Sequence, residues 1–333
     1  MNFEMKCFIR LRYFTKTTGK GAWSSLEYIH GTDDFQLNKK SAVTLGKFDG
    51  IHTGHQKLIE IVRQKADEEN LLAVLFTFDS LPLSICPQKY QHFISTSSER
   101  RRLCENFGID VEIEYPFTEE FMNMEPEDFI CRILIDKLHA KYVVVGTDYR
   151  FGKDRAGDAA MLVEAGEELG FTTIIVEKEK YQDKEISSTY IREELKVGHM
   201  ETVNVLLNRP FNVTGVVSIG NQLGRKLDFP TINIYPTEYK LLPPNGVYAT
   251  QTTIDGEKFY GVTNLGTKPT VSDAPEISVE TFLFDFDKDV YGKKVDVEFI
   301  HFIRPEMKFE DVDGLKRQIA ADSDFARNMF LIG

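Results

Sequence analysis

Short apolar runs alternate with amphipathic stretches over the first part of the chain. Runs at 41–45, 71–78, 110–115, 141–146 and 172–177 are expected to be strands, and the segments 54–70, 97–108, 125–140 and 158–170 have helical spacing. Strands that are apolar on both sides and separated by amphipathic helices are typical of a parallel sheet covered on each face. We therefore predict a doubly wound α/β domain.

After residue 208 the pattern changes to β-rich segments at 211–220, 230–236, 246–262, 279–286 and 293–303. Asp255-Gly256 inside the third segment predicts a hairpin turn, and a helical pattern over 309–330 closes the chain. These features predict a small antiparallel β-barrel with a C-terminal helix. We expect domains at 26–204 and 205–333. The basic stretch 1–25 holds the only tryptophan and has no continuous apolar run, so it is expected to be an N-terminal extension.

Composition narrows the class of protein. The net charge of −12 argues against a protein that wraps nucleic acid, and no apolar run is long enough to cross a membrane. Four scattered cysteines without a CxxC pair favour a reducing compartment, so the chain is expected to be cytoplasmic, with each cysteine a small buried side chain. Small anionic substrates remain compatible with the charge. Nothing in the sequence decides whether chains associate.

The segment Gly46–Gln56, GKFDGIHTGHQ, follows the first predicted strand of this fold and leads into its first helix. Such turns lie at the carboxyl edge of the sheet, where a helix N-terminus offers free N–H groups to an anion. His52 and His55 can add ring donors, with Gly54 between them. The alternative is a glycine-rich turn that only connects strand and helix, but the position after the first strand favours a phosphate site.

A second hydroxyl-rich helix start, ISSTYIREEL, occupies 186–195. Taken alone, its hydroxyl residues are best explained as a helix N-cap. Taken with the histidine turn, the two segments are candidates for two ends of one triphosphate clamp, with Arg192 one turn inside the helix.

The β-rich half contains a further candidate, GNQLGRKLDFPTINI at 220–234. Thr231 and Asn233 point to the same side of an extended segment, and such oxygen donors suit Mg²⁺ shared with phosphates. Glu280 interrupts the apolar run 279–286. The alternatives are a plain strand after a turn and a solvated glutamate.

Together these motifs resemble bacterial bifunctional riboflavin kinase/FAD synthetases from about residue 26 to the C-terminus. The first half carries GKFDGIHTGH, VGTDYRFGKDRAGD and ISSTYIR, and the second carries FPTIN, GVTNLGTKPT and VETFLFDF. The resemblance implies ATP-dependent phosphorylation of riboflavin to FMN, with Glu280 as general base and Thr231 and Asn233 on Mg–ATP. It also implies adenylylation of FMN to FAD, with His52, His55 and Arg192 on the ATP phosphates.

The resemblance also implies further contacts to ATP or flavin, by Gly46, Phe48, Asp49, Gly54, Asp148, Ser187, Ser188, Thr189, Gly220, Gly224 and Arg225. The chain departs from the family at Ser80 and Leu81, where a Pro-His pair is usual, and at Asp228, which replaces a glycine and is expected to point outward. Two other interpretations are a monofunctional small-molecule adenylyltransferase with an appended barrel, and a non-catalytic flavin sensor. The first would leave FPTIN and VETFLFDF without a role.

Overall fold

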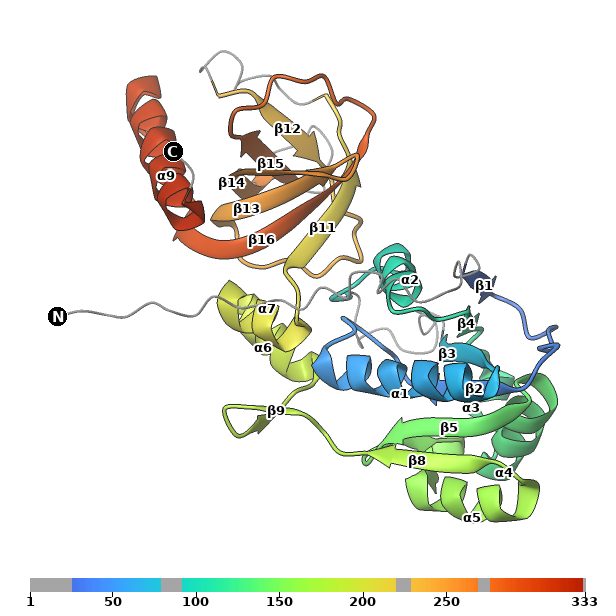
Figure 1. The fold of residues 1–333 in the computed structure, drawn as a ribbon. Coiled ribbons are helices and arrows are strands. Elements are labelled where there is room, and N and C mark those ends of the chain that lie inside the picture. The colour runs from blue at the N-terminus through green and yellow to red at the C-terminus, as the bar shows by residue number, and fades with distance from the viewer. Residues whose placement is uncertain (1–25, 79–91, 220–228, 269–275, 332–333) are drawn as a thin grey trace. The chain divides into compact units, whose positions relative to one another are not determined.

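The computed structural model describes residues 26–78, 92–219, 229–268 and 276–331 (Figure 1). The predicted extension 1–25 lies outside these ranges, as do Ser80, Leu81, Gly220, Gly224, Arg225 and Asp228. Contacts divide the chain into two compact units. The first holds residues up to 91 and 97–187, and the second holds 92–96 and 188–333. The predicted domain boundary at 204/205 stays a prediction.

The first unit contains the predicted parallel sheet. Its strands are β1 (Glu27–His30), β2 (Ser41–Leu45), β3 (Leu72–Phe78), β4 (Val111–Tyr115), β5 (Ala140–Gly146) and β8 (Thr172–Val176). All neighbours pair in parallel, in the order β1-β4-β3-β2-β5-β8. Five strands were expected from their apolar runs. The short edge strand β1 was not, because it lacks such a run.

Helices cover both faces of this sheet, which confirms the doubly wound prediction (Figure 1). On one face, α1 (Thr53–Glu69) and α2 (Ser97–Asn106) bury their apolar sides in one core. On the other face, α5 (Ala159–Leu169) and η1 (Phe129–Lys137) form a second core. The pattern at 125–140 predicts one helix; it is instead a short α4 (Pro126–Asp128) continued by η1, a π-helix. Wider turns of this kind are rare and cannot be distinguished by apolar spacing.

Short elements complete the first unit. They are α3 (Glu119–Met122), β6 (Arg150–Phe151), η2 (Lys153–Arg155), β7 (Gly157–Asp158), β9 (Lys180–Tyr181) and β10 (Lys184–Glu185). Cys104 is buried as expected, but Cys131 on η1 is exposed, so the expectation of burial was wrong for that residue. The helical pattern places Cys131 on the outer side of η1, and residue type alone does not reveal that side.

The second unit is the predicted antiparallel barrel. Its strands are β11 (Phe211–Val216), β12 (Thr231–Ile234), β13 (Gly246–Ile254), β14 (Glu257–Lys268), β15 (Glu276–Leu283) and β16 (Lys294–Pro305), in the order β11-β16-β13-β14-β15-β12. A bridge between Ser218 and Asn233 joins the two outer strands. The predicted hairpin is confirmed, since Asp255 and Gly256 between β13 and β14 have φ of 51° and 84°, as the tight turn requires.

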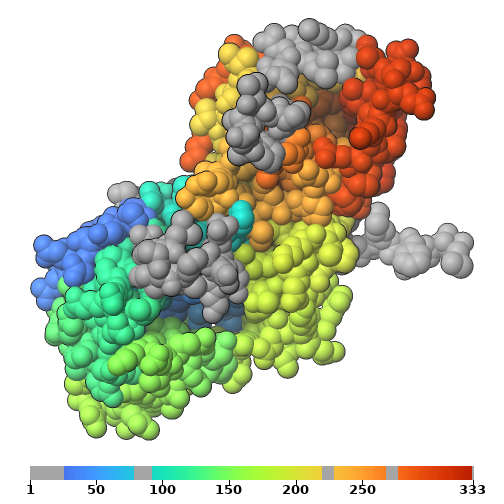
Figure 2. Space-filling view, turned by 180° about the vertical axis from the view of Figure 1, so that it is seen from behind, coloured from blue at the N-terminus to red at the C-terminus, as the bar shows by residue number. Residues whose placement is uncertain are grey.

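Among the residues that the structure describes, three helices lie in the second unit with the barrel. The long α9 (Val312–Phe330) packs on the apolar face of β13, β14 and β15, and Figure 2 shows its red surface against the orange strands. Two helices that the sequence pattern did not separate, α6 (Ser188–Lys196) and α7 (Met200–Leu207), precede β11. Among the helices of the described residues, none is long and apolar enough to span a bilayer.

Candidate functional sites

The turn between β2 and α1 is held in an unusual backbone conformation. Phe48 and Ile51 have φ of 49° and 38°, a region that L-residues with bulky side chains rarely adopt. Both side chains are fully buried, so packing holds the strained turn in place. Strain that packing maintains is concentrated at functional sites in proteins. This strain makes the turn a candidate functional site.

The two histidines of this turn lie against each other. His52 is the N-cap of α1, and its Nδ1 accepts a hydrogen bond from the backbone N–H of His55 at 3.4 Å. The two rings are stacked, with centroids 3.7 Å apart and planes 20° apart. An Nδ1 that accepts carries no proton, so the neutral His52 ring carries its proton on Nε2 and can donate there.

His55 is held in its uncharged form. Burial, and then the neighbouring His52 ring, lower the pKa of His55 well below 6.5. Its Nδ1 and the hydroxyl of Thr53 are buried and make no hydrogen bond to any residue that the structure describes. Buried polar atoms without partners are rare in folded proteins. Beside the free N–H groups of the α1 N-terminus, they fit a cradle for a polar, anionic ligand such as a phosphate chain.

The second predicted end of the clamp lies at the start of α6. The helix begins at Ser188, directly after Ser187, and Arg192 donates from Nη1 to the carbonyl of His92 at 2.9 Å. Residues 92–96 and 188 onward belong to the second unit, whereas the histidine turn belongs to the first. The shared triphosphate clamp therefore stays a prediction.

Asp148 also lies in the first unit, beyond the end of β5. Its carboxylate is 3.0 Å from the ammonium group of Lys178, and its side chain is 68% exposed. Gly146 leaves room for this carboxylate, since a Cβ there would lie 3.3 Å from Asp148 Oδ1. Its predicted place in a flavin or nucleotide wall is not decided by these contacts.

The candidate groups of the barrel share one face of two neighbouring strands. In the ladder between β12 and β15, Asn233 lies directly opposite Glu280, and Thr231 lies two residues along the same strand. Partners in an antiparallel ladder point to the same side, so these three side chains share a face. Asn233 is buried, while Thr231 and Glu280 are half-buried. The structure thus brings together the three barrel residues singled out from the sequence.

These donors fit a magnesium ion better than a transition metal. The Thr231 hydroxyl and the Asn233 amide oxygen are hard oxygen ligands, and Mg²⁺ takes most of its other ligands from phosphates and water. Over the residues that the structure describes, no group of three or more His, Cys, Asp and Glu could hold a metal.

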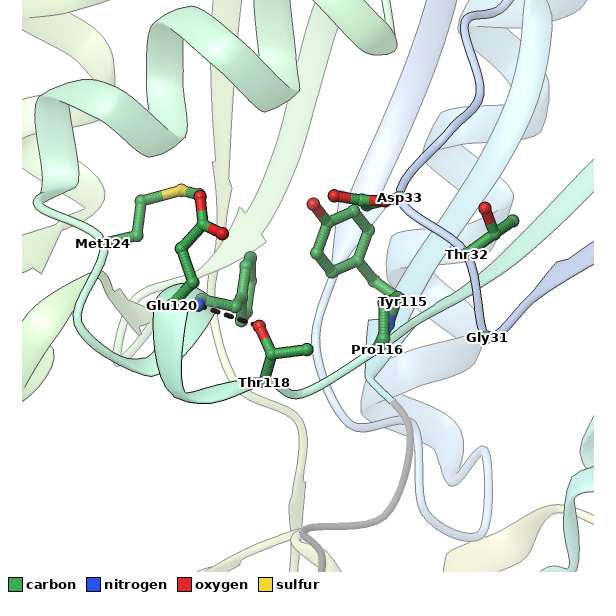
Figure 3. A pocket seen from close by; sticks show the side chains of 9 residues that line it. Gly31, Thr32, Asp33, Tyr115, Pro116, Thr118, Glu120 and Met124 are labelled. Atoms are coloured by element: carbon green, nitrogen blue, oxygen red, sulfur yellow. Dashed lines mark hydrogen bonds between the residues drawn. The ribbon is translucent and has the colours of Figure 1, made fainter.

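A separate pocket of about 340 Å³ opens at the carboxyl ends of β1 and β4 (Figure 3). Asp33 and Glu120 bring two carboxylates to it, and Tyr115, Phe121 and Met124 provide apolar surface. Burial and then Asp33 raise the pKa of Tyr115 above its usual value. Two carboxylates repel phosphate, so this pocket is a poor candidate for a triphosphate site, and none of the residues chosen from the sequence lines it.

One polar residue of the barrel face was missed from the sequence. Asn264 on β14 lies directly opposite Glu280, on the side away from Asn233. It stands within the segment GVTNLGTKPT, where it is the only amide side chain. Only the pairing register of β14 with β15 reveals its position. The two strands pair from Gly261↔Leu283 to Lys268↔Glu276, and this register places Asn264 beside Glu280.

Comparison with known proteins assigns each half of the chain to a protein family. A model of the FAD synthetase family matches residues 34–190, and one of the riboflavin kinase family matches residues 207–330. A bifunctional riboflavin kinase/FMN adenylyltransferase of Haemophilus influenzae is 37% identical over 87% of this chain and 94% of its own length. The chain belongs to the bifunctional riboflavin kinase/FMN adenylyltransferase family. The family resemblance predicted from the motifs is confirmed.

Other members of this family cover the same extent. The bifunctional riboflavin kinase/FMN adenylyltransferase of Bacillus subtilis is 36% identical over 92% of this chain and 98% of its own length. A crystal structure from Streptococcus pneumoniae, described as a macrolide-efflux protein, superimposes with a TM-score of 0.81 at 30% identity, over 92% of this chain and 99% of that one. The arrangement of a parallel-sheet unit followed by a barrel is thus shared with that crystal structure.

Proposed function

We propose that this chain phosphorylates riboflavin to FMN in its second unit and adenylylates FMN to FAD in its first. The observation that carries the proposal is the position of Glu280 directly opposite Asn233, on the same face as Thr231. A carboxylate there can accept a proton from an alcohol while the oxygen donors beside it hold a metal. Membership of the bifunctional family supports both activities.

In the kinase step, Glu280 acts as general base. It accepts the proton of the terminal ribityl hydroxyl, whose oxygen bonds to the γ-phosphorus of ATP as the bond to the β-phosphate breaks and ADP leaves. Thr231 and Asn233 would hold Mg²⁺, which when bound shields the phosphate charge. Gly220, Gly224 and Arg225 are proposed to approach the same phosphates.

In the adenylylation step, an oxygen of the FMN phosphate attacks the α-phosphorus of ATP and pyrophosphate leaves. This phosphate is already an anion, so the chain supplies alignment and hydrogen bonds rather than a base. His52 and His55 bind the ATP phosphates, and Gly46, Phe48, Asp49 and Gly54 shape the turn around them. The contacts of Ser187, Ser188, Thr189, Arg192 and Asp148 with the nucleotide stay predictions from the family resemblance.

The proposal involves small molecules only, namely riboflavin, FMN, FAD and ATP with Mg²⁺, in the cytoplasm and without nucleic acid. Incubation of the protein with riboflavin, ATP and Mg²⁺, followed by chromatography, should yield FMN and then FAD. FAD formed only from supplied FMN would indicate the monofunctional transferase. Flavin binding without any product would indicate the sensor.

The two sites should be separable. Glu280→Ala is expected to lower FMN formation by about 100-fold or more while supplied FMN is still converted to FAD, and His55→Ala should do the reverse. Glu298→Ala is a matched control, because Glu298 is a barrel glutamate on β16 that bonds to Gln251. If either site variant removed both activities in a folded protein, the two sites would not be independent.

A further inference from the structure

Glu280 stands between two asparagines in the barrel sheet. Strand β15 lies between β12 and β14, and Glu280 pairs with Asn233 on one side and with Asn264 on the other. Neighbouring strands are about 4.8 Å apart, so a group bound at the Glu280 carboxylate is also within reach of the Asn264 amide. The proposed function gives Asn233 a role and leaves Asn264 without one.

The amide of Asn264 is available to a ligand. Its side chain is half-buried and makes no hydrogen bond to any part of the described chain. By contrast, the amide groups of Asn204, Asn212 and Asn245 in the same unit all donate hydrogen bonds. A half-buried amide that is left unpaired on the face of the general base is best explained by a partner that arrives with the substrate.

A neighbouring glycine keeps this amide accessible. An ideal Cβ at Gly266, two residues along β14, would lie 2.4 Å from Glu306 Oε1 and 3.1 Å from Asn264 Nδ2. Any side chain at this position would therefore crowd the amide. On the opposite face of the sheet, hydroxyls satisfy one another, since Thr263 bonds to Thr250 at 2.7 Å and to Thr281 at 2.8 Å. Thr252 on that face also has a buried hydroxyl without a hydrogen bond to the described chain, so Asn264 is distinguished by its place opposite Glu280 rather than by being unpaired.

We propose that Asn264 binds an internal hydroxyl of the ribityl chain and so selects a polyhydroxylated alcohol as the acceptor. This inference rests on the proposed kinase function. Glu280 acts on the terminal hydroxyl, and the next hydroxyls along the chain lie a few ångströms away, a distance comparable to the spacing between adjacent strands. An amide can both donate to and accept from a hydroxyl, which suits a polyol better than a carboxylate or an ammonium group would.

The test compares two acceptors that share the isoalloxazine ring and the terminal hydroxyl. Riboflavin carries the internal hydroxyls, and 10-(5-hydroxypentyl)isoalloxazine with the same ring methyl groups lacks them. The wild type should prefer riboflavin in kcat/KM, and Asn264→Ala should reduce this preference by about tenfold, because the lost hydrogen bond exists with only one of the two acceptors. Asn264→Leu, which preserves the volume, should reduce it equally.

Asn212→Ala is the matched control, since this barrel amide on β11 bonds to Thr214 and Asp296 away from the candidate groups. It should leave the preference unchanged. A fall in kcat/KM by the same factor for both acceptors, or an increase in KM for ATP alone, would overturn the role of Asn264. If the wild type formed no FMN from riboflavin, the kinase proposal itself would fail, so the two failures are distinguishable.

Discussion

A methyl group at Gly54 would collide with the histidine pair. An ideal Cβ there lies 3.3 Å from Nδ1 and 3.4 Å from Cε1 of His52, so Gly54→Ala should displace this ring. FAD formation from supplied FMN should fall by about tenfold or more, since small misplacements of binding groups are costly in catalysis. FMN formation should be unchanged.

The same variant separates misplacement from misfolding. Alanine is a better helix former than glycine by about 1 kcal/mol, and Gly54 is in the first turn of α1. Thermal unfolding should therefore show unchanged or higher stability. A variant that lost adenylylation together with stability would contradict this explanation.

His55 should make the first unit sensitive to acid. Its pKa is lower in the folded protein than the ordinary 6.5, so the unfolded chain binds the proton more tightly. The stabilisation is present above pH 6.5 and is lost as pH falls below it, by at most about 1.4 kcal/mol per pH unit. Urea unfolding of wild type and His55→Gln between pH 5 and 8 should show a shallower acid decline in the variant. Parallel curves would contradict the prediction.

At the scale of elements, a buried charge cluster joins α2 to β4. The Arg100 guanidinium lies 2.8 Å from a carboxylate oxygen of Glu112 and 2.8 Å from one of Glu114, and all three side chains are almost fully buried. Burial raises the pKa of Glu112 even though Arg100 opposes this effect. Arg100→Met would leave two buried carboxylates without their cation, at a cost of about 3–5 kcal/mol in the free energy of unfolding.

Urea unfolding measures the loss in the free energy of unfolding caused by Arg100→Met. Two further variants show whether this loss comes from unpaired charge or from packing. Adding Glu112→Gln and Glu114→Gln to Arg100→Met should recover part of the loss, because the unpaired charges are then removed. Lys65→Met, which breaks an exposed pair with Glu68, should leave the free energy of unfolding nearly unchanged. A full loss in the triple variant would point to packing rather than charge.

At the scale of the whole molecule, α7 is integrated with the barrel. The Asn204 side chain accepts from the N–H of Phe211 at 2.7 Å and donates to the carbonyl of Phe299 at 2.9 Å. Met200, Val203 and Leu206 of the same helix are fully buried. A fragment 188–333 should therefore unfold at a higher temperature than a fragment 205–333, as measured by circular dichroism. Equal midpoints would favour the boundary at 204/205 predicted from the change in the sequence pattern.

The sequence by itself determined both fold classes, because apolar runs and helical spacing depend on local periodicity. It also identified the His52–His55 turn and the Thr231–Asn233–Glu280 set through motifs of adjacent residues. It missed β1 and the π-helical turns of η1, and it did not select Asn264. The stacking of the two histidine rings and the position of Glu280 between two asparagines were decided only by the tertiary structure. The physical reason is that strand register arises from packing between segments distant in the sequence, while the ring contact depends on a turn whose positive φ values at the buried Phe48 and Ile51 are held by packing. Apolar spacing along the chain records neither.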